Sequence, residues 1–265
     1  MKDYDFVGIT LPKEMLSEKP VYDKAPVLQG SAVILFDVQC PFQDGEFIYN
    51  VLTLASAWGI KQGISGGDFF NEGAFSLFLH RPEDTIWKEE SKKATELIKV
   101  MLELVPEWMF ILGNHDAFLL KKLAHQLDHE DLLRLVNAPN AVKATDYYWC
   151  LVLDSEGNKW RITHPRNVSV IHGRVPQRLS DKFGCNIIAG HGHLAGITYS
   201  QSGEYIAIDV GICCDPRRLD YAMERDNLRP IQNQGAVILR EVKGKIYPYH
   251  LLPKFTDWEG LRKLR

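Results

Sequence analysis

The order of predicted elements along this 265-residue chain indicates an α/β protein with a layered architecture. In the first half, apolar runs of strand length alternate with amphipathic helical runs, and hairpins dominate the last third. This order is typical of a sandwich that combines mixed β-sheets with helices. Polar residues also gather where the predicted strands end, which is where open α/β sheets bind their ligands.

The first half of the chain opens with a run over 31–36 that is short, apolar and rich in aliphatic residues, as in a strand buried on both faces. A helix is expected from Phe47, with Asp44 in position to cap it. The longest amphipathic pattern, over 82–105, predicts a second helix. In chain order, the predicted strands of this half are 31–36, 60–65 and 108–112, and the predicted helices are 47–58, 82–105, 117–126 and 130–136.

The second half is richer in strands. The turn residues Ser155-Glu156-Gly157-Asn158 separate two strand-like segments and predict a hairpin. Two further hairpins are expected to turn at Ser202-Gly203 and Lys243-Gly244. The predicted strands of this half are 147–153, 159–163, 185–189, 196–200, 204–210, 236–242 and 245–251, with one helix over 178–183.

Composition excludes several classes of protein. Hydrophobic residues make up 45% and charged residues 25%, as in ordinary globular proteins. No apolar run has the length of a membrane span, and the N-terminus lacks a secretory signal pattern. We therefore expect a soluble, cytoplasmic protein with no membrane partner. A net charge of -3 argues against binding nucleic acid through a pervasive positive field. The five irregularly spaced cysteines are expected to be buried free thiols.

Four segments share one design, in which an apolar strand runs into a tight turn that carries Asp, Asn or His. A fifth, Ile162-Thr163-His164-Pro165, ends a strand in the same way. Carboxylate, amide and imidazole donors that converge from several strand ends suit a divalent cation site. The four segments are Phe36-Asp37-Val38-Gln39, Gly66-Gly67-Asp68, Leu112-Gly113-Asn114-His115-Asp116 and Ala189-Gly190-His191-Gly192-His193.

This series of motifs resembles the calcineurin-like metallophosphoesterase superfamily over roughly residues 31–215. The family series runs Asp-x-His, Gly-Asp, Gly-Asn-His-Asp/Glu, a lone His and Gly-His-x-His, and the segment 37–44 is similar to phage and prokaryotic members. The resemblance implies a layered α/β/β/α sandwich of two mixed β-sheets flanked by helices. We accordingly expect an N-terminal arm over 1–28 and a single metallophosphoesterase domain over 29–265.

The resemblance also implies a dinuclear-metal hydrolase of phosphate esters, a phosphodiesterase or phosphatase. The two cations would acidify a bridging water that attacks phosphorus and would stabilise the developing charge. His115 would give a proton to the leaving oxygen as general acid, and Asp116 would orient its ring. The implied ligands are Asp37, Gln39, Asp68 and His193 for the first metal, and the bridging Asp68 with Asn114, His164 and His191 for the second.

Gln39 departs from the family pattern, which has His at this position. An amide oxygen is a poorer ligand for zinc or iron than imidazole, so the first site becomes richer in oxygen donors. We therefore favour manganese as the divalent metal, with iron, zinc, nickel or magnesium as the other candidates. Gln also occurs here in active branches of the superfamily.

Two alternatives stay open. His164 is favoured as the lone histidine ligand because it ends a strand, whereas His172 precedes Gly173 as the family dipeptide does. A phosphate-ester substrate is expected, with nucleotides and nucleic acids among the candidates. The alternative function is a weakly active or non-catalytic protein of the same fold that binds nucleic acid or a protein partner. The intact Gly-Asn-His-Asp and Gly-His-Gly-His motifs argue against it.

Overall fold

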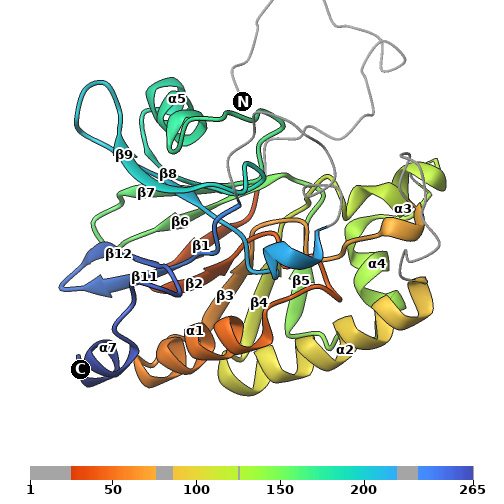
Figure 1. Cartoon of the computed structure of the whole chain (residues 1–265). Helices are drawn as coiled ribbons and strands as arrows, with labels where there is room; N and C mark the ends of the chain where they lie inside the picture. The colour runs from red at the N-terminus through yellow and green to blue at the C-terminus, as the bar shows by residue number, and fades with distance from the viewer. Residues whose placement is uncertain (1–24, 76–85, 125, 220–231, 265) are drawn as a thin grey trace, which may run out of the picture.

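Two β-sheets stack face to face at the centre of the protein (Figure 1). A computed structural model describes the chain over residues 25–75, 86–124, 126–219 and 232–264. Most of the arm predicted over 1–28 lies outside this part. Each sheet has six strands and mixes parallel with antiparallel pairing, so the predicted fold class is confirmed.

Sheet 1 has the strand order β12-β11-β2-β3-β4-β5. Strands β2 to β5 are parallel, and β11 pairs antiparallel with both β2 and β12. Parallel pairing brings the C-terminal ends of β2, β3 and β4 to one edge of the sheet. The strands of sheet 1 are β2 (Ala32–Leu35), β3 (Gln62–Ser65), β4 (Glu107–Phe110), β5 (Val142–Ala144), β11 (Ala236–Val242) and β12 (Lys245–Leu251).

Sheet 2 has the strand order β1-β6-β7-β8-β10-β9. Two of the predicted hairpins, β6–β7 and β9–β10, form antiparallel pairs in it, and β7 and β8 run parallel. The strands of sheet 2 are β1 (Val27–Gln29), β6 (Trp149–Leu153), β7 (Lys159–Thr163), β8 (Asn186–Ala189), β9 (Ala195–Tyr199) and β10 (Ile206–Val210).

The main core between the sheets is aliphatic. Ile34 and Ile64 of sheet 1 and Ile162, Ile188 and Ile208 of sheet 2 are fully buried in one cluster. Alternate residues of a strand face opposite sides of its sheet, and so the neighbours of Ile34 pack outward, against the helices. Sheet 1 is thus buried on two faces.

Helices cover the outer face of each sheet (Figure 1). Val33 and Leu35 pack with residues of α1 and α2 on sheet 1, while Leu179 of α5 packs on Ile187 and Ala189 of sheet 2. None of the helices in the described residues is long and apolar enough to cross a membrane. The helices are α1 (Gly45–Ala57), α2 (Trp87–Leu104), α3 (Ala117–Lys122), α4 (His129–Leu135), α5 (Arg174–Phe183) and α7 (Trp258–Lys263), with short 3-10 turns at Gly73–Phe75 and Pro216–Arg218.

Most predicted elements are confirmed within a few residues of their expected ends. Asp44 caps α1, since its side chain accepts the backbone N–H of Phe47 at 3.0 Å. All five cysteines are free and buried, as expected. Helix α5 begins earlier than predicted because Pro176 is tolerated in a first helical turn. The sequence did not predict β1, β5 or α7, and residues 27 and 28 of the expected arm belong to β1.

Candidate metal centre

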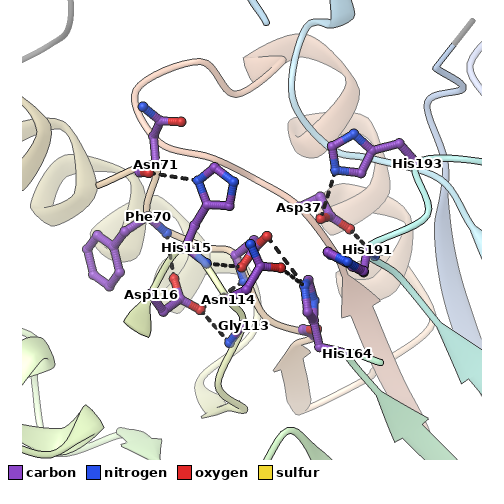
Figure 2. A network of polar contacts seen from close by, with 12 residues as sticks. Asp37, Phe70, Asn71, Gly113, Asn114, His115, Asp116, His164, His191 and His193 are labelled. Carbon is purple, nitrogen blue, oxygen red and sulfur yellow. Dashed lines mark hydrogen bonds and ion pairs between the residues drawn. The ribbon is translucent and has the colours of Figure 1, made fainter. Parts of the chain in front are cut away.

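The predicted ligands follow the C-terminal ends of strands from both sheets (Figure 2). Sheet 1 supplies mainly oxygen donors and sheet 2 supplies imidazoles. The site residues are Asp37 and Gln39 after β2, Asp68 after β3, Asn114, His115 and Asp116 after β4, His164 after β7, and His191 and His193 after β8.

The side chains predicted for the second metal lie together. His164 Nε2 is 3.3 Å from Asp68 Oδ2 and 3.1 Å from Asn114 Oδ1. The ring centroids of His164 and His191 are 5.0 Å apart. One ligand atom each from Asp68, His164 and His191 lies within 4.8 Å of the others, so these three residues could hold a metal ion.

Two residues predicted for the first metal are also in contact. His193 Nε2 lies 3.2 Å from Asp37 Oδ1, and Asp37 Oδ2 accepts the backbone N–H of His191 at 3.0 Å. Asp37 is fully buried. A buried carboxylate requires compensating charge or hydrogen bonds, and these two contacts supply them. The hydrogen bond from His191 also joins a predicted ligand of the second metal to one of the first.

The side chain of Gln39 provides a direct test of whether these residues fit a metal. Gln39 is fully buried, and neither its Oε1 nor its Nε2 atom has a hydrogen-bond partner. An unsatisfied buried polar group costs about 1–3 kcal/mol. A cation bound within reach of the Oε1 atom would give it a partner, and an unsatisfied buried oxygen among the predicted ligands fits a metal centre.

The backbone at the predicted ligands is strained. Nine non-glycine residues in the described parts of the chain have positive φ angles, and five of them are predicted ligands. Each such residue costs on the order of 1–3 kcal/mol, and this kind of strain clusters at functional sites. The five are Asp37 (49°), Gln39 (45°), Asp68 (53°), His191 (68°) and His193 (57°).

Two glycines allow the ligand loops to approach one another. A Cβ atom at Gly113 would overlap the backbone nitrogen and Oδ1 of Asp68. A Cβ atom at Gly190 would lie 2.7 Å from Asp37 Oδ2. Only glycine leaves room for these close contacts, which accounts for the glycines before Asn114 and His191.

The electrostatics of the centre couple the carboxylates to the imidazoles. Burial alone would lower the pKa of His164, but the adjacent Asp68 carboxylate overrides it and raises the pKa to about 9. Burial lowers the pKa of His191 to about 4, and the charge of His164 adds to the decrease. Burial opposes ionisation of Asp68, yet the charges of His164 and His115 hold its pKa below the usual range. Asp68 is therefore a carboxylate near neutral pH and is available to a cation.

His115 lies beside the predicted bridging ligand. Its backbone N–H donates to Asp68 Oδ1 at 2.8 Å, and its ring Nδ1 lies 2.8 Å from the carbonyl oxygen of Asn71 (Figure 2). A carbonyl oxygen can only accept, so Nδ1 carries a hydrogen and donates it. Sequence reasoning missed Asn71, because a backbone carbonyl has no residue-type signature.

Asp116, which was predicted to orient the His115 ring, binds backbone N–H groups through its side chain. Its Oδ2 atom accepts the backbone N–H groups of Asp68 at 2.8 Å and Gly113 at 3.0 Å, and its Oδ1 atom accepts that of Phe70 at 2.9 Å. Burial raises the pKa of the Asp116 carboxyl, and the negative charge of the nearby Asp68 raises it further. Asp116 instead joins the loops after β3 and β4, because three backbone donors converge on it.

The two candidates for the lone histidine ligand differ in position. His164 is buried in the cluster just described, whereas His172 is exposed and its Nδ1 atom donates to the Ala195 carbonyl oxygen at 2.7 Å. The geometry therefore favours His164.

Comparison with known proteins identifies the family. The model for calcineurin-like phosphoesterases matches residues 53–233, which is more than half of the chain. The chain belongs to the calcineurin-like phosphoesterase family. The matched region contains the site residues from Asp68 to His193 and begins after Asp37 and Gln39.

One solved structure that matches this calcineurin-like phosphoesterase shares little sequence with it. The solution NMR structure of the Thermotoga maritima protein TM1076 is 12% identical, with a TM-score of 0.40, and the match covers 84% of this chain and 99% of that one. No curated protein matches the chain.

Proposed function

We propose that this calcineurin-like phosphoesterase is a two-metal hydrolase of phosphate esters with His115 as its general acid. The observation that supports the proposal best is the contact between His115 and Asp68. A histidine held by a backbone carbonyl stands directly beside a carboxylate that also contacts His164.

The metal ligands follow from the donors that the two sheets bring together. The first metal would be held by Asp37, Gln39, Asp68 and His193, and the second by Asp68, Asn114, His164 and His191. When bound, the two cations would supply an acidified water nucleophile and neutralise charge on the phosphoryl group. Three oxygen donors beside the single imidazole of His193 favour manganese at the first position.

His115 would act on the leaving group. Its Nδ1 hydrogen is directed to the Asn71 carbonyl oxygen, so Nε2 is the atom from which an imidazolium would deliver a proton. Protonating the leaving alkoxide avoids expelling it as a charged oxygen, and such general acid catalysis contributes about 10²–10⁴-fold in rate.

A substrate screen tests the proposal. The manganese-loaded protein should hydrolyse at least one of an aryl phosphomonoester, an aryl phosphodiester, a cyclic nucleotide and a DNA end. Asp68→Asn should abolish that activity. Asp154→Asn is the matched control, because Asp154 is also buried but binds the turn between β6 and β7 and the backbone N–H of Ile246, at the end of β7 opposite His164. Absence of turnover on every substrate, with retained binding of nucleic acid or a protein, would support the non-catalytic alternative.

A further inference from the structure

Two buried carboxyl groups contact the segments around His115 and have no assigned role in the metal centre. The side chains of Glu72 and Glu90 are both fully buried. Glu72 stands in the loop after β3, four residues beyond Asp68, and Glu90 lies in the first turn of α2. Glutamate is almost never fully buried unless it is paired, and so this pair requires an explanation.

The first contact joins the two residues. The backbone N–H of Glu72 donates to Oε1 of Glu90 at 2.8 Å, across 18 positions in sequence. Glu72 itself has a φ angle of 48°, a conformation that non-glycine residues avoid. Glu90 thus holds the loop in a strained conformation immediately after Asn71.

The second contact joins Glu72 to the helix that follows His115. Its Oε2 atom accepts the backbone N–H of Leu119 at 2.7 Å. Leu119 lies in the first turn of α3. Asp116 is the N-cap residue of this helix, but its side chain does not accept a hydrogen bond from the first turn. Glu72 therefore supplies, from another segment, the acceptor that the start of this helix needs.

These two contacts bracket His115. On one side, the Asn71 carbonyl that accepts from His115 Nδ1 belongs to the residue before Glu72. On the other side, the His115 carbonyl accepts the backbone N–H of Phe118, the residue before Leu119. The ring and the main chain of His115 are both fixed by segments that Glu72 and Glu90 hold.

Both carboxyls are in their neutral form near pH 7. Burial raises the pKa of Glu72 to about 10 and that of Glu90 to about 8. The remaining atoms, Glu72 Oε1 and Glu90 Oε2, have no hydrogen-bond partner. A neutral acid still accepts a backbone N–H, which is the only contact that the arrangement uses.

We propose that Glu72 and Glu90 are positioning residues for His115, fixing its Nδ1–H tautomer and the direction of its ring. Only the expected effect of these residues on turnover rests on the proposed function. The tautomer can be measured in the resting protein, so the two proposals can fail separately.

The test compares Glu90→Gln, which keeps an acceptor oxygen, with Glu90→Met, which has similar size and no oxygen. Nitrogen NMR shifts of the His115 ring report the tautomer. Rates for aryl phosphodiesters with good and poor leaving groups report proton donation. Glu90→Met should give a mixture of tautomers and lose about 10-fold or more with the poor leaving group, as part of the ~10²–10⁴-fold effect of general acid catalysis. The rate of Glu90→Met with the good leaving group should change little. Glu90→Gln should show the wild-type tautomer and the wild-type rate with the poor leaving group.

Thr95→Val is the matched control on the same helix, because it removes a 2.7 Å hydrogen bond to the Val136 carbonyl. It should lower stability without moving the tautomer or the leaving-group dependence. Glu90→Asp, which withdraws the carboxyl by one methylene, replaces Glu90→Met if the latter does not fold. An unchanged tautomer in the acceptor-shortened or acceptor-free variant would overturn the proposal, as would an equal rate loss on both substrates. An inactive wild type with a fixed Nδ1–H tautomer would overturn only the proposed function.

Discussion

The ring of His115 is anchored to the carbonyl oxygen of Asn71, at a distance of 2.8 Å from Nδ1. This main-chain acceptor fixes the tautomer of the ring, because a carbonyl oxygen accepts a hydrogen from Nδ1 and cannot donate one.

The first prediction concerns His115 itself. His115→Asn should reduce turnover by about 10²–10⁴-fold, the usual size of a general acid contribution. Metal content, measured by elemental analysis of the purified variant, should stay at the wild-type level because His115 is not a predicted ligand. Loss of metal from this variant would move His115 into the coordination sphere.

The second prediction separates His164 from His172. His164→Ala should deplete the second metal, because this ring contacts Asp68 and Asn114. His172→Ala should keep both metals and mainly change KM, because His172 is exposed and contacts the Ala195 carbonyl. Metal analysis of the two variants decides the assignment, and the reverse pattern would make His172 the ligand.

The third prediction concerns the unpartnered amide of Gln39. Manganese should activate the wild type more than zinc does, since oxygen donors suit manganese and imidazole favours zinc. Gln39→His should tighten zinc binding and narrow or invert this preference. Calorimetric titration with each metal gives the affinities independently of turnover. Identical affinities and activation order in the two proteins would show that Gln39 does not reach the metal.

The fourth prediction concerns Asp116, whose carboxylate accepts three backbone N–H groups. Asp116→Ala should lower the free energy of unfolding by at least ~2 kcal/mol, because each buried donor left unsatisfied costs about 1–3 kcal/mol. Asp131→Ala removes a partly exposed side chain from the capping box of α4 and serves as control, with a smaller expected loss. Chemical denaturation measures both, and equal losses would contradict the role of Asp116.

The fifth prediction uses the pKa of Glu90, which burial raises from 4.5 to about 8. The folded state keeps a proton that the unfolded state releases, so stability from this group is present below about pH 4.5 and is lost as the pH rises to about 8. Wild-type unfolding free energy should therefore fall more steeply between pH 5.5 and 7.5 than that of Glu90→Gln, by up to ~1.4 kcal/mol per pH unit. Denaturation at several pH values measures the difference in slope. If the unfolding free energy of Glu90→Gln fell more steeply with pH than that of the wild type, the assignment of the raised pKa to Glu90 would be contradicted.

The sequence predicted those parts of the fold and site that depend on local pattern. Asp68 and His191 could be placed because each follows a predicted strand that ends in a glycine, and Asp37 because it directly follows the apolar run 31–36. Strands β1 and β5 were missed because three residues are too few to show alternation.

The contacts within the site that the sequence did not predict are made across the chain. The role expected for Asp116, orienting the His115 ring, came from the family resemblance. In the structure its side chain reaches the backbone of Asp68 and Phe70, 48 and 46 positions away. Contacts with backbone atoms depend on how the loops fold and not on residue type, and so neither these nor the Asn71 carbonyl could be read from the sequence.

The division of ligands between the two sheets has a consequence for the stability of the molecule. Asp37, Asp68 and Asn114 come from sheet 1, whereas His164, His191 and His193 come from sheet 2. A cation shared by the two groups would act as a cross-link between the layers at this edge of the sandwich. Free cation at 100 times its dissociation constant would stabilise the folded state by about 2.7 kcal/mol. Chelation should therefore lower the melting temperature. In the chelated protein, the edge of the sandwich that carries the metal ligands should exchange its amide hydrogens sooner than the opposite edge does.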